Sequence, residues 1–335
     1  MNMEEMIRSF PDQINEQFNN LKSETFDSNL FKNIKSIVIA GMGGSAISGD
    51  LVRILTKDHI SIPITVIRDY SIPSWSNEDT LFILSSYSGN TEETMSCFDA
   101  ALSKSKKLIA ICTGGKLQEK SIDNNVRVIS IPKGYQPRAA LGYSLITLLS
   151  ILNKLQVLES DFLGSVINAS NKLDSFYDEF CKRDSLAYNI AQKLKGSMIA
   201  IYGVESSTDH IAGRLRAQIA ENAKMLATYN VLPEMNHNEI EAWNKTQFSN
   251  MKKIAIWISD KDDHPRVLQR IKITSELLEE IDVENIFITC DGDNYPERCL
   301  KLLFLNDWIS FYLAEINNTD PMPVDRIMNL KNKLS

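Results

Sequence analysis

Short apolar runs alternate with longer amphipathic stretches along this chain, and the alternation occurs twice. Runs of this kind, rich in Ile and Val and separated by enough residues for a helix, predict parallel strands joined by crossover helices. We therefore expect two doubly wound, flavodoxin-like α/β sheets in tandem, each covered by helices on both faces. The expected strands are residues 36–40, 62–67, 80–84, 107–111 and 126–131, then 197–202, 227–232, 253–258 and 284–289.

Two series of strands indicate two domains, which is also the usual number for a chain of 335 residues. A helical stretch at 140–154 follows the first series, and polar residues near 159–165 mark a joint before the second. We expect an N-terminal domain of residues 1–154 and a C-terminal domain of residues 155–335. Ligands of such folds bind outside the carboxyl ends of the strands, often between domains.

The composition argues against several classes of protein. The formal net charge is −7 and the sequence has no dense basic patch, so nucleic acid is not an expected partner. The five cysteines are scattered, without a CxxC or Cys/His cluster, which argues against a metal site and fits a reducing compartment. The apolar runs are too short to span a bilayer, and the N-terminus is acidic where a signal peptide would be basic. We expect a cytoplasmic protein that does not contact a membrane.

The segment Ser85–Thr94 follows one expected strand and opens a predicted helix. We expect Asn90 to cap this helix, and a glutamate three residues later comes close to a capping box. Backbone N–H groups and the positive end of a helix dipole would meet hydroxyl groups there, which favours a small anion such as a phosphate monoester. The hydroxyl groups belong to Ser86, Ser88 and Thr91.

The segment Gly41–Ala46 matches the dinucleotide pattern G-x-G-x-x-G/A and also precedes a predicted helix. Gly43 and Gly44 would let the backbone approach a ligand closely, or would only form a tight turn. Asp69, at the end of the next strand, lies about where a ribose-binding carboxylate is expected. We rank a dinucleotide below a sugar phosphate, because a dinucleotide would leave the hydroxyl-rich segment unexplained.

Four further residues are candidates for chemistry, and each has an ordinary structural alternative. Arg138, just before a helix, could stabilise a developing anion or lie at the surface. Glu221, in an otherwise apolar helical stretch, could be a general base or lie on a solvated face. His237 follows a strand and could exchange protons or merely flank a helix cap. Lys331, in the amphipathic C-terminal stretch, would ordinarily be a solvated lysine.

Six segments, in this order and across nearly the whole chain, resemble the bifunctional phosphoglucose/phosphomannose isomerase family, whose members carry two sugar-isomerase (SIS) domains. Any one segment is a weak signal, but the set is specific. The resemblance implies a homodimer that acts on a hexose 6-phosphate, with its active site at the domain and subunit interface and with no metal or organic cofactor. The matching segments are Gly41–Ser45, Ser85–Thr94, Pro137–Tyr143, Glu221–Lys224, Asn236–Glu239 and Ile327–Lys331.

The resemblance also implies roles for individual residues. Glu221 would move a proton between C2 and C1 of the sugar, and Arg138 would stabilise the cis-enediolate. His237, supplied by the neighbouring subunit, and Lys331 would serve ring opening and proton transfer at O5 and O1. The phosphate would be held by Ser45, Ser86, Ser88 and Thr91, on loops that include Gly43 and Gly44.

The chain departs from the family pattern near its C-terminus. Some members carry a threonine near the terminal lysine that helps to admit the mannose epimer, whereas Met322 and Val324 occupy that neighbourhood here. Glucose 6-phosphate is therefore the first expected substrate and mannose 6-phosphate the second. Two other functions stay open: a sugar-phosphate-binding regulator without catalysis, and an NAD(P)-dependent oxidoreductase suggested by Gly41–Ala46 alone.

Overall fold

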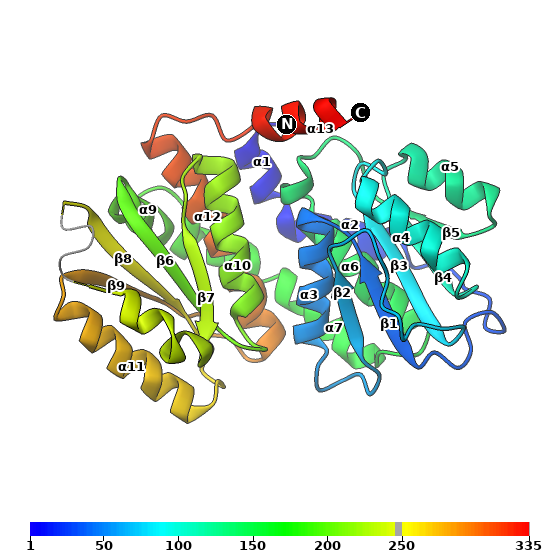
Figure 1. Cartoon of the computed structure of the whole chain (residues 1–335), viewed down its shortest axis with the longest axis horizontal. Coiled ribbons are helices and arrows are strands. Elements are labelled where there is room, and N and C mark those ends of the chain that lie inside the picture. Colours follow the sequence, from blue (N-terminus) through cyan, green and yellow to red (C-terminus); the bar gives the residue numbers. More distant parts are fainter. Residues whose placement is uncertain (245–249, 335) are drawn as a thin grey trace. The chain divides into compact units, whose positions relative to one another are not determined.

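The computed structural model describes residues 1–244 and 250–334. The chain forms two units, each built on one parallel sheet (Figure 1). The prediction of two doubly wound α/β sheets is confirmed. The first unit contains Met1 and Arg8–Asn171, and the second contains Asn2–Ile7 and the residues from Lys172 onward.

Five parallel strands form the first sheet: β1 (Ser36–Ala40), β2 (Ile64–Ile67), β3 (Thr80–Ser86), β4 (Leu108–Cys112) and β5 (Arg127–Ser130). Their order, β2-β1-β3-β4-β5, is that of flavodoxin. Strand β3 is buried at every position, as its apolar sequence requires in the middle of a covered sheet. Strand β2 lies at an edge, where the preceding Pro63 costs no ladder hydrogen bond.

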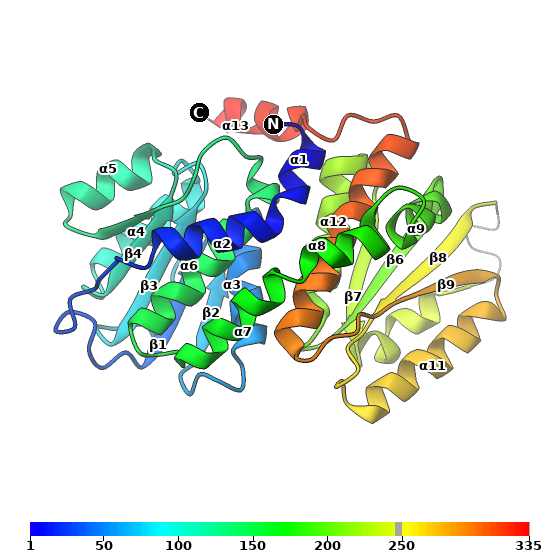
Figure 2. The same cartoon turned by 180° about the vertical axis from the view of Figure 1, so that it is seen from behind.

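Helices cover both faces of this sheet. One face packs Phe82 and Leu84 of β3 against Phe98 and Leu117 of two covering helices. Figure 2 shows two further helices lying outside α6, which makes the other face two helical layers deep. The inner helices are α4 (Glu92–Leu102) and α5 (Gly115–Asp123) on one face and α3 (Gly43–Leu55) and α6 (Leu141–Lys154) on the other, and the outer ones are α2 (Phe10–Asn20) and α7 (Ser160–Ser170).

The second sheet has the strand order β7-β6-β8-β9. One face is covered by α11, and its core includes Tyr202, Met235 and Trp257. The other face is covered by α9, α10 and the long, largely buried α12. The strands are β6 (Ser197–Val204), β7 (Thr228–Leu232), β8 (Lys252–Ile258) and β9 (Val283–Ile288). The helices are α1 (Met3–Arg8), α8 (Leu173–Phe176), α9 (Leu186–Leu194), α10 (Asp209–Gln218), α11 (Pro265–Glu279), α12 (Tyr295–Ile316) and α13 (Asp325–Leu334).

The division between the units differs from the one expected from the sequence. It falls between Asn171 and Lys172 rather than after Lys154, because α7 packs on α2 and α6 of the first unit. The short helix α1 belongs to the second unit, where Met3 is buried together with the other apolar residues of that helix. The polar residues near 159–165, expected to be a joint, therefore cap and begin helix α7 inside the first unit.

The loop that ends β3 interlocks with the loop that ends β4. Thr91, not Asn90, is the N-cap of α4, so that expectation was wrong. The Asn90 side chain instead accepts a hydrogen bond from the backbone N–H of Lys116 at the start of α5, with a length of 3.1 Å. Gly89 makes the close approach possible, because it has a φ of 69° and lies against Gly114.

This packing predicts opposite effects for two glycine substitutions. A Cβ on Gly89 would lie 1.7 Å from the carbonyl oxygen of Gly114, so Gly89→Ala should lower the free energy of unfolding by more than ~1 kcal/mol. Gly164, inside α7, has open space within 4 Å of the place that a Cβ would take, so Gly164→Ala should raise it by about 0.5–1 kcal/mol. Urea unfolding of both variants measures the difference, and an unaffected Gly89→Ala protein would contradict the interlocked loops.

Candidate active site

The crevice of the first unit lies at the carboxyl edge of its sheet, where the strand order reverses between β1 and β3. Ala40 pairs with Leu84, so the loops that follow these strands leave side by side. A Cβ on Gly41 would lie 2.8 Å from the carbonyl oxygen of Ser85, which places the loop after β1 in contact with the end of β3. They lead into α3 and α4, and at neither helix start does a backbone N–H donate to a capping side chain. Two helix N-termini with N–H groups available for a ligand therefore meet at this edge.

Hydroxyl groups line the same edge in a defined arrangement. Ser86 Oγ and Thr91 Oγ1 are 2.8 Å apart, and Ser86 Oγ also accepts a hydrogen bond from the Gly89 N–H at 3.1 Å. Ser88 Oγ accepts from the Asn90 N–H at 3.2 Å, at an exposed position. These bonds hold the loop so that hydroxyl and N–H donors are ordered without any ligand.

Arg138 lies beside the start of α3. It belongs to a 3-10 turn, Pro137–Ala139, whose Pro137 carbonyl oxygen would be 2.8 Å from a Cβ on Gly44. The arginine is only 4% exposed, which excludes the alternative of a surface residue. Its Nη1 donates to Gln136 Oε1 at 3.4 Å. A buried guanidinium therefore accompanies the donors of the crevice.

These contacts bring the predicted anion-binding residues of the first unit to one edge of the sheet. The set consists of Gly43, Gly44, Ser45, Ser86, Ser88 and Thr91. Arg138, predicted to stabilise the enediolate, lies beside it. Asp69 also follows a strand of this sheet, but its carboxylate accepts from the Tyr70 N–H at 2.6 Å and the Ser71 hydroxyl at 3.3 Å in its own turn. The geometry thus favours a compact anion over a ribose.

The equivalent crevice of the second unit is filled by the chain itself. Arg298, 1% exposed, donates from Nε and Nη2 to the carboxylate of Asp260 at 2.6 and 2.9 Å. Its Nη2 also lies 2.5 Å from Asp262. Asp260 and Asp262 follow β8, which adjoins β6 at the point where the strand order reverses. The Arg298 guanidinium, paired with two aspartates, therefore lies at the edge of the second sheet that corresponds to the edge with the ligand-binding donors in the first unit.

Glu221 lies on an irregular end of helix α10. The sequence predicts a continuous helix over residues 209–224, whereas residues Ile219–Ala223 form a π-helical turn that ends at Lys224 in the left-handed conformation, with a φ of 55°. Asn222 fixes this turn, because its buried Nδ2 donates to Ser310 Oγ on α12 at 2.9 Å. Turns of this kind are frequent at functional sites, because the extra residue redirects the side chains next to it.

A cavity of about 670 Å³ adjoins this turn. Glu221 is half-buried and lines it, so the carboxylate reaches a concave surface as a general base requires. The Lys224 ammonium donates to the carbonyl oxygens of Glu221 at 2.5 Å and Pro323 at 2.8 Å, and so ties the C-terminal segment to the turn. No sequence pattern predicted these hydrogen bonds of Lys224. The lining residues are Ala220, Glu221, Lys224, Met225 and Leu226 from the turn, and Pro323, Val324, Asp325, Arg326 and Ile327 from the C-terminal segment.

The other two candidates do not line this cavity. His237 is exposed on a 3-10 turn, Glu234–His237, that follows β7. Lys331 is exposed on α13, whose residues are all at the surface within the described part of the chain. Within the second unit, therefore, only Glu221 of the three predicted catalytic residues lines the cavity.

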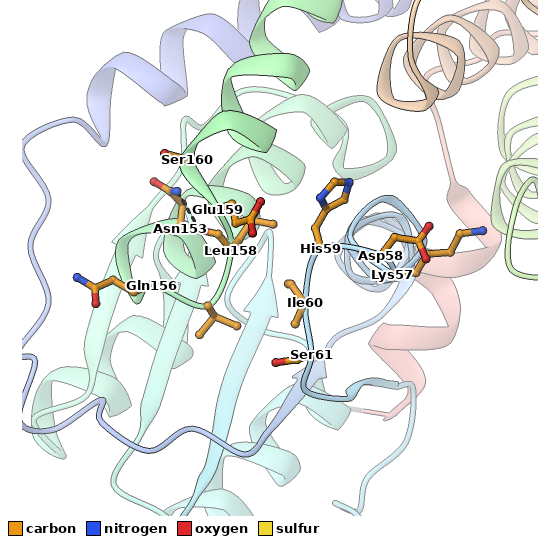
Figure 3. A pocket seen from close by; sticks show the side chains of 11 residues that line it. Lys57, Asp58, His59, Ile60, Ser61, Asn153, Gln156, Leu158, Glu159 and Ser160 are labelled. Atoms are coloured by element: carbon orange, nitrogen blue, oxygen red, sulfur yellow. Dashed lines mark hydrogen bonds between the residues drawn. The ribbon is translucent and has the colours of Figure 1, made fainter.

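A second cavity, of about 780 Å³, lies at the opposite edge of the first sheet. It is formed by the loop before β2 and the loop after α6, and Figure 3 shows His59 and Ser61 on one side and Asn153 and Glu159 on the other. The His59 ring packs against Phe162 with 4.5 Å between ring centroids. Ligands of doubly wound folds bind at the carboxyl ends of strands, so we assign no ligand to this cavity.

Other kinds of chemistry find no support in residues 1–244 and 250–334. No group of three metal-ligating side chains occurs there, and no helix is long and apolar enough to cross a membrane. None of the described cysteines forms a disulfide, and burial raises the pKa of the Cys97 thiol to about 11, which makes it a poor nucleophile at neutral pH.

The chain is similar to known proteins along nearly its whole length. A bifunctional phosphoglucose/phosphomannose isomerase of Caldicellulosiruptor bescii is 38% identical over 345 residues, covering 99% of each chain. The chain belongs to the bifunctional phosphoglucose/phosphomannose isomerase family. The family member of Aquifex aeolicus is 36% identical over 90% of each chain. The family model for the bacterial phospho-glucose isomerase C-terminal SIS domain matches residues 183–334.

A solved structure extends the likeness to the fold. The C-terminal domain of a glucosamine-fructose-6-phosphate aminotransferase from Francisella tularensis superposes with a TM-score of 0.76, covering 95% of this chain and 97% of that one. At 14% identity, this likeness concerns the fold alone. The relatives named above confirm the resemblance to the isomerase family that the six sequence segments indicated.

Removal of one hydroxyl tests the anion site of this isomerase-family chain. Thr91→Val keeps the shape of the side chain but removes the hydroxyl beside Ser86. A hydrogen bond to a charged group contributes about 1.5–3 kcal/mol, so inorganic phosphate should bind about 10-fold to 100-fold more weakly. An NMR titration with phosphate measures the affinity, and Thr65→Val in the edge strand β2 serves as the control. Equal phosphate affinity in Thr91→Val and wild type would show that the anion does not bind at this edge.

Proposed function

We propose that this protein interconverts glucose 6-phosphate, and also mannose 6-phosphate, with fructose 6-phosphate. The support is twofold: relatives named as bifunctional isomerases match along almost the whole chain, and Glu221 faces a cavity from a braced π-helical turn. The position of Glu221 is the observation that supports the mechanism, because aldose–ketose isomerisation needs one positioned base. Asp325 also lines this cavity, but it is exposed at the start of α13.

The proposed reaction moves one proton between neighbouring carbons. The sugar phosphate is held by the hydroxyl and N–H donors at the start of α3 and α4. Glu221 removes the C2 proton of the open-chain aldose, and the C–H electron pair forms the C1=C2 bond while O1 takes up negative charge. The Arg138 guanidinium stabilises this enediolate through its fixed donors. The proton on O2 then passes to O1, the C2 carbonyl forms, and the electron pair of the C1=C2 bond takes the proton from Glu221 at C1.

Ring opening precedes this step, and we assign it to His237 and Lys331. Both side chains are exposed within their unit, so they are available to a substrate bound elsewhere. His237 acts on the site of a neighbouring subunit in a homodimer, and Lys331 transfers protons at O5 and O1. The reaction uses hydrogen transfer within the substrate, so no organic cofactor takes part.

The C-terminal segment bears on the choice of epimer. Val324 lines the cavity that contains Glu221, and its apolar side chain offers no hydrogen bond to a hydroxyl at C2. We propose glucose 6-phosphate as the preferred substrate and mannose 6-phosphate as the second one. The absence of disulfides among the described cysteines agrees with a cytoplasmic enzyme of sugar-phosphate metabolism.

Replacement of the base tests the mechanism. Glu221→Gln keeps the size of the side chain but cannot accept the C2 proton, so kcat should fall by about 10²–10⁴-fold while phosphate binding is retained. A coupled assay of fructose 6-phosphate formation measures kcat, with Glu276→Gln on the exposed face of α11 as the control.

Three results, from this assay and from ligand-binding and heat-protection measurements, would contradict the proposal. Undiminished turnover in Glu221→Gln would contradict the assigned base. Wild-type protein that binds hexose phosphate without isomerising it would indicate a regulator. Protection against heat by NAD(P) but not by hexose phosphate would indicate an oxidoreductase.

Substitution of Val324 tests the choice of epimer. Val324→Thr keeps the branched shape and adds a hydroxyl to the cavity wall, so the ratio of mannose to glucose 6-phosphate activity, in kcat/KM, should rise about 3-fold to 10-fold. Val324→Ala changes the volume alone and is the matched control. An equal ratio in all three proteins would show that position 324 does not select between the epimers.

A further inference from the structure

The turn that carries His237 is anchored on its N-terminal side. Met235 is fully buried in the core beneath α11. Asn236 then donates from Nδ2 to Thr274 Oγ1 of α11 at 2.8 Å. The chain is thus fixed to the body of the second unit immediately before His237.

A carboxylate anchors the same turn on its C-terminal side. Glu239 accepts a hydrogen bond from the Tyr202 phenol at 2.8 Å and another from Asn230 Nδ2 at 2.7 Å, so one side chain reaches two neighbouring strands. Tyr202 is fully buried and also accepts from Trp243 Nε1 at 2.8 Å. Burial first, and the charge of Glu239 second, raise the pKa of Tyr202 well above its usual value, so the phenol stays protonated and remains a donor.

Between the two anchors, only His237 and Asn238 face solvent. Asn238 is used locally, because its Nδ2 donates to Glu234 Oε1 at 2.7 Å and its Oδ1 accepts from the Glu239 N–H at 2.6 Å. Hydrogen bonds and buried side chains therefore fix the backbone on both sides of the exposed His237 imidazole. A group that must act on a molecule outside its own unit needs this kind of support, because a loose ring would lose its alignment.

We infer that Glu239 is a positioning residue for the isomerase reaction, which acts by holding His237 in place through its bonds to Tyr202 and Asn230. This inference rests on the proposed function, because it needs His237 to take part in ring opening. Glutamine at this position would keep the volume but not the two acceptors. Its amide NH₂ would face the Asn230 amide NH₂ or the Tyr202 hydroxyl, so one anchor would be lost.

The experiment compares Glu239→Gln, His237→Ala and the double variant. Glu241→Gln is the matched control, because Glu241 is exposed on the 3-10 turn Glu239–Ala242 that also contains Glu239. Turnover is measured on glucose 6-phosphate, whose ring must open. Exchange of the C2 hydrogen with deuterated water is measured on erythrose 4-phosphate, which has no free hydroxyl placed to close a ring. The second substrate reports on Glu221 without the ring-opening step.

We expect Glu239→Gln to lower kcat on glucose 6-phosphate by about 10-fold to 100-fold with little change in KM, as small misplacements of a reacting group do. Exchange on erythrose 4-phosphate should stay near the wild-type rate. Addition of Glu239→Gln to His237→Ala should cause no further loss, because the two residues would act as one unit. Glu241→Gln should behave as wild type.

Other results would overturn the inference. Wild-type turnover by Glu239→Gln, an additive loss in the double variant, or equal losses on both substrates would each assign Glu239 a structural role only. If Glu239→Gln does not fold, as judged by its melting temperature, Tyr202→Phe removes the same bond from the other side and should show the same pattern. Wild-type protein without turnover would defeat the proposed function, and with it this inference, whatever the variants do.

Discussion

The crevice between β1 and β3 is the constraint on which the rest of the first unit depends. Right-handed crossovers send α3 and α4 to opposite faces of the sheet, so the loops that end β1 and β3 separate above the sheet edge. Two helix starts without side-chain caps then point into the gap. Their N–H groups would be costly to bury without an acceptor, and the anion of the proposed substrate would supply one. Ser86, Thr91 and the buried Arg138 add donors at the same place.

The two sheets share an architecture but use it differently. In the second unit, the pair of Arg298 with Asp260 occupies the equivalent crevice, and the buried charges satisfy each other. That unit instead offers the cavity beside the π-helical turn, where Glu221 is held by the bonds of Asn222 and Lys224. The proposed function accordingly assigns anion binding to the first unit and proton transfer to the second. A base used in this way must be positioned, because a carboxylate on a regular, solvated helix face has no fixed relation to a carbon atom.

Much of the architecture was predictable from local sequence. Strand β1 has the predicted bounds, because its apolar run is short, β-branched and bounded by turn residues. The interlock of loops was not predictable. Asn90 has the right chemistry for capping α4, yet it bonds to Lys116 because Gly89 lets a neighbouring loop come close. The domain joint was misplaced for a similar reason: α7 is polar at its start, but its other face packs on the first unit.

The sequence alone determined three features: the order of strands and helices, the hydroxyl-rich loop, and the residue types needed for isomerisation. It could do so because periodicity and motif spacing are local properties. Only the tertiary structure decided that Arg138 is buried beside the helix starts and that Arg298 closes the second crevice. It also decided that Glu221 sits on a π-helical turn and that Glu239 secures the His237 turn. Each of these depends on contacts between residues far apart in the chain, and such contacts leave no trace in a local pattern.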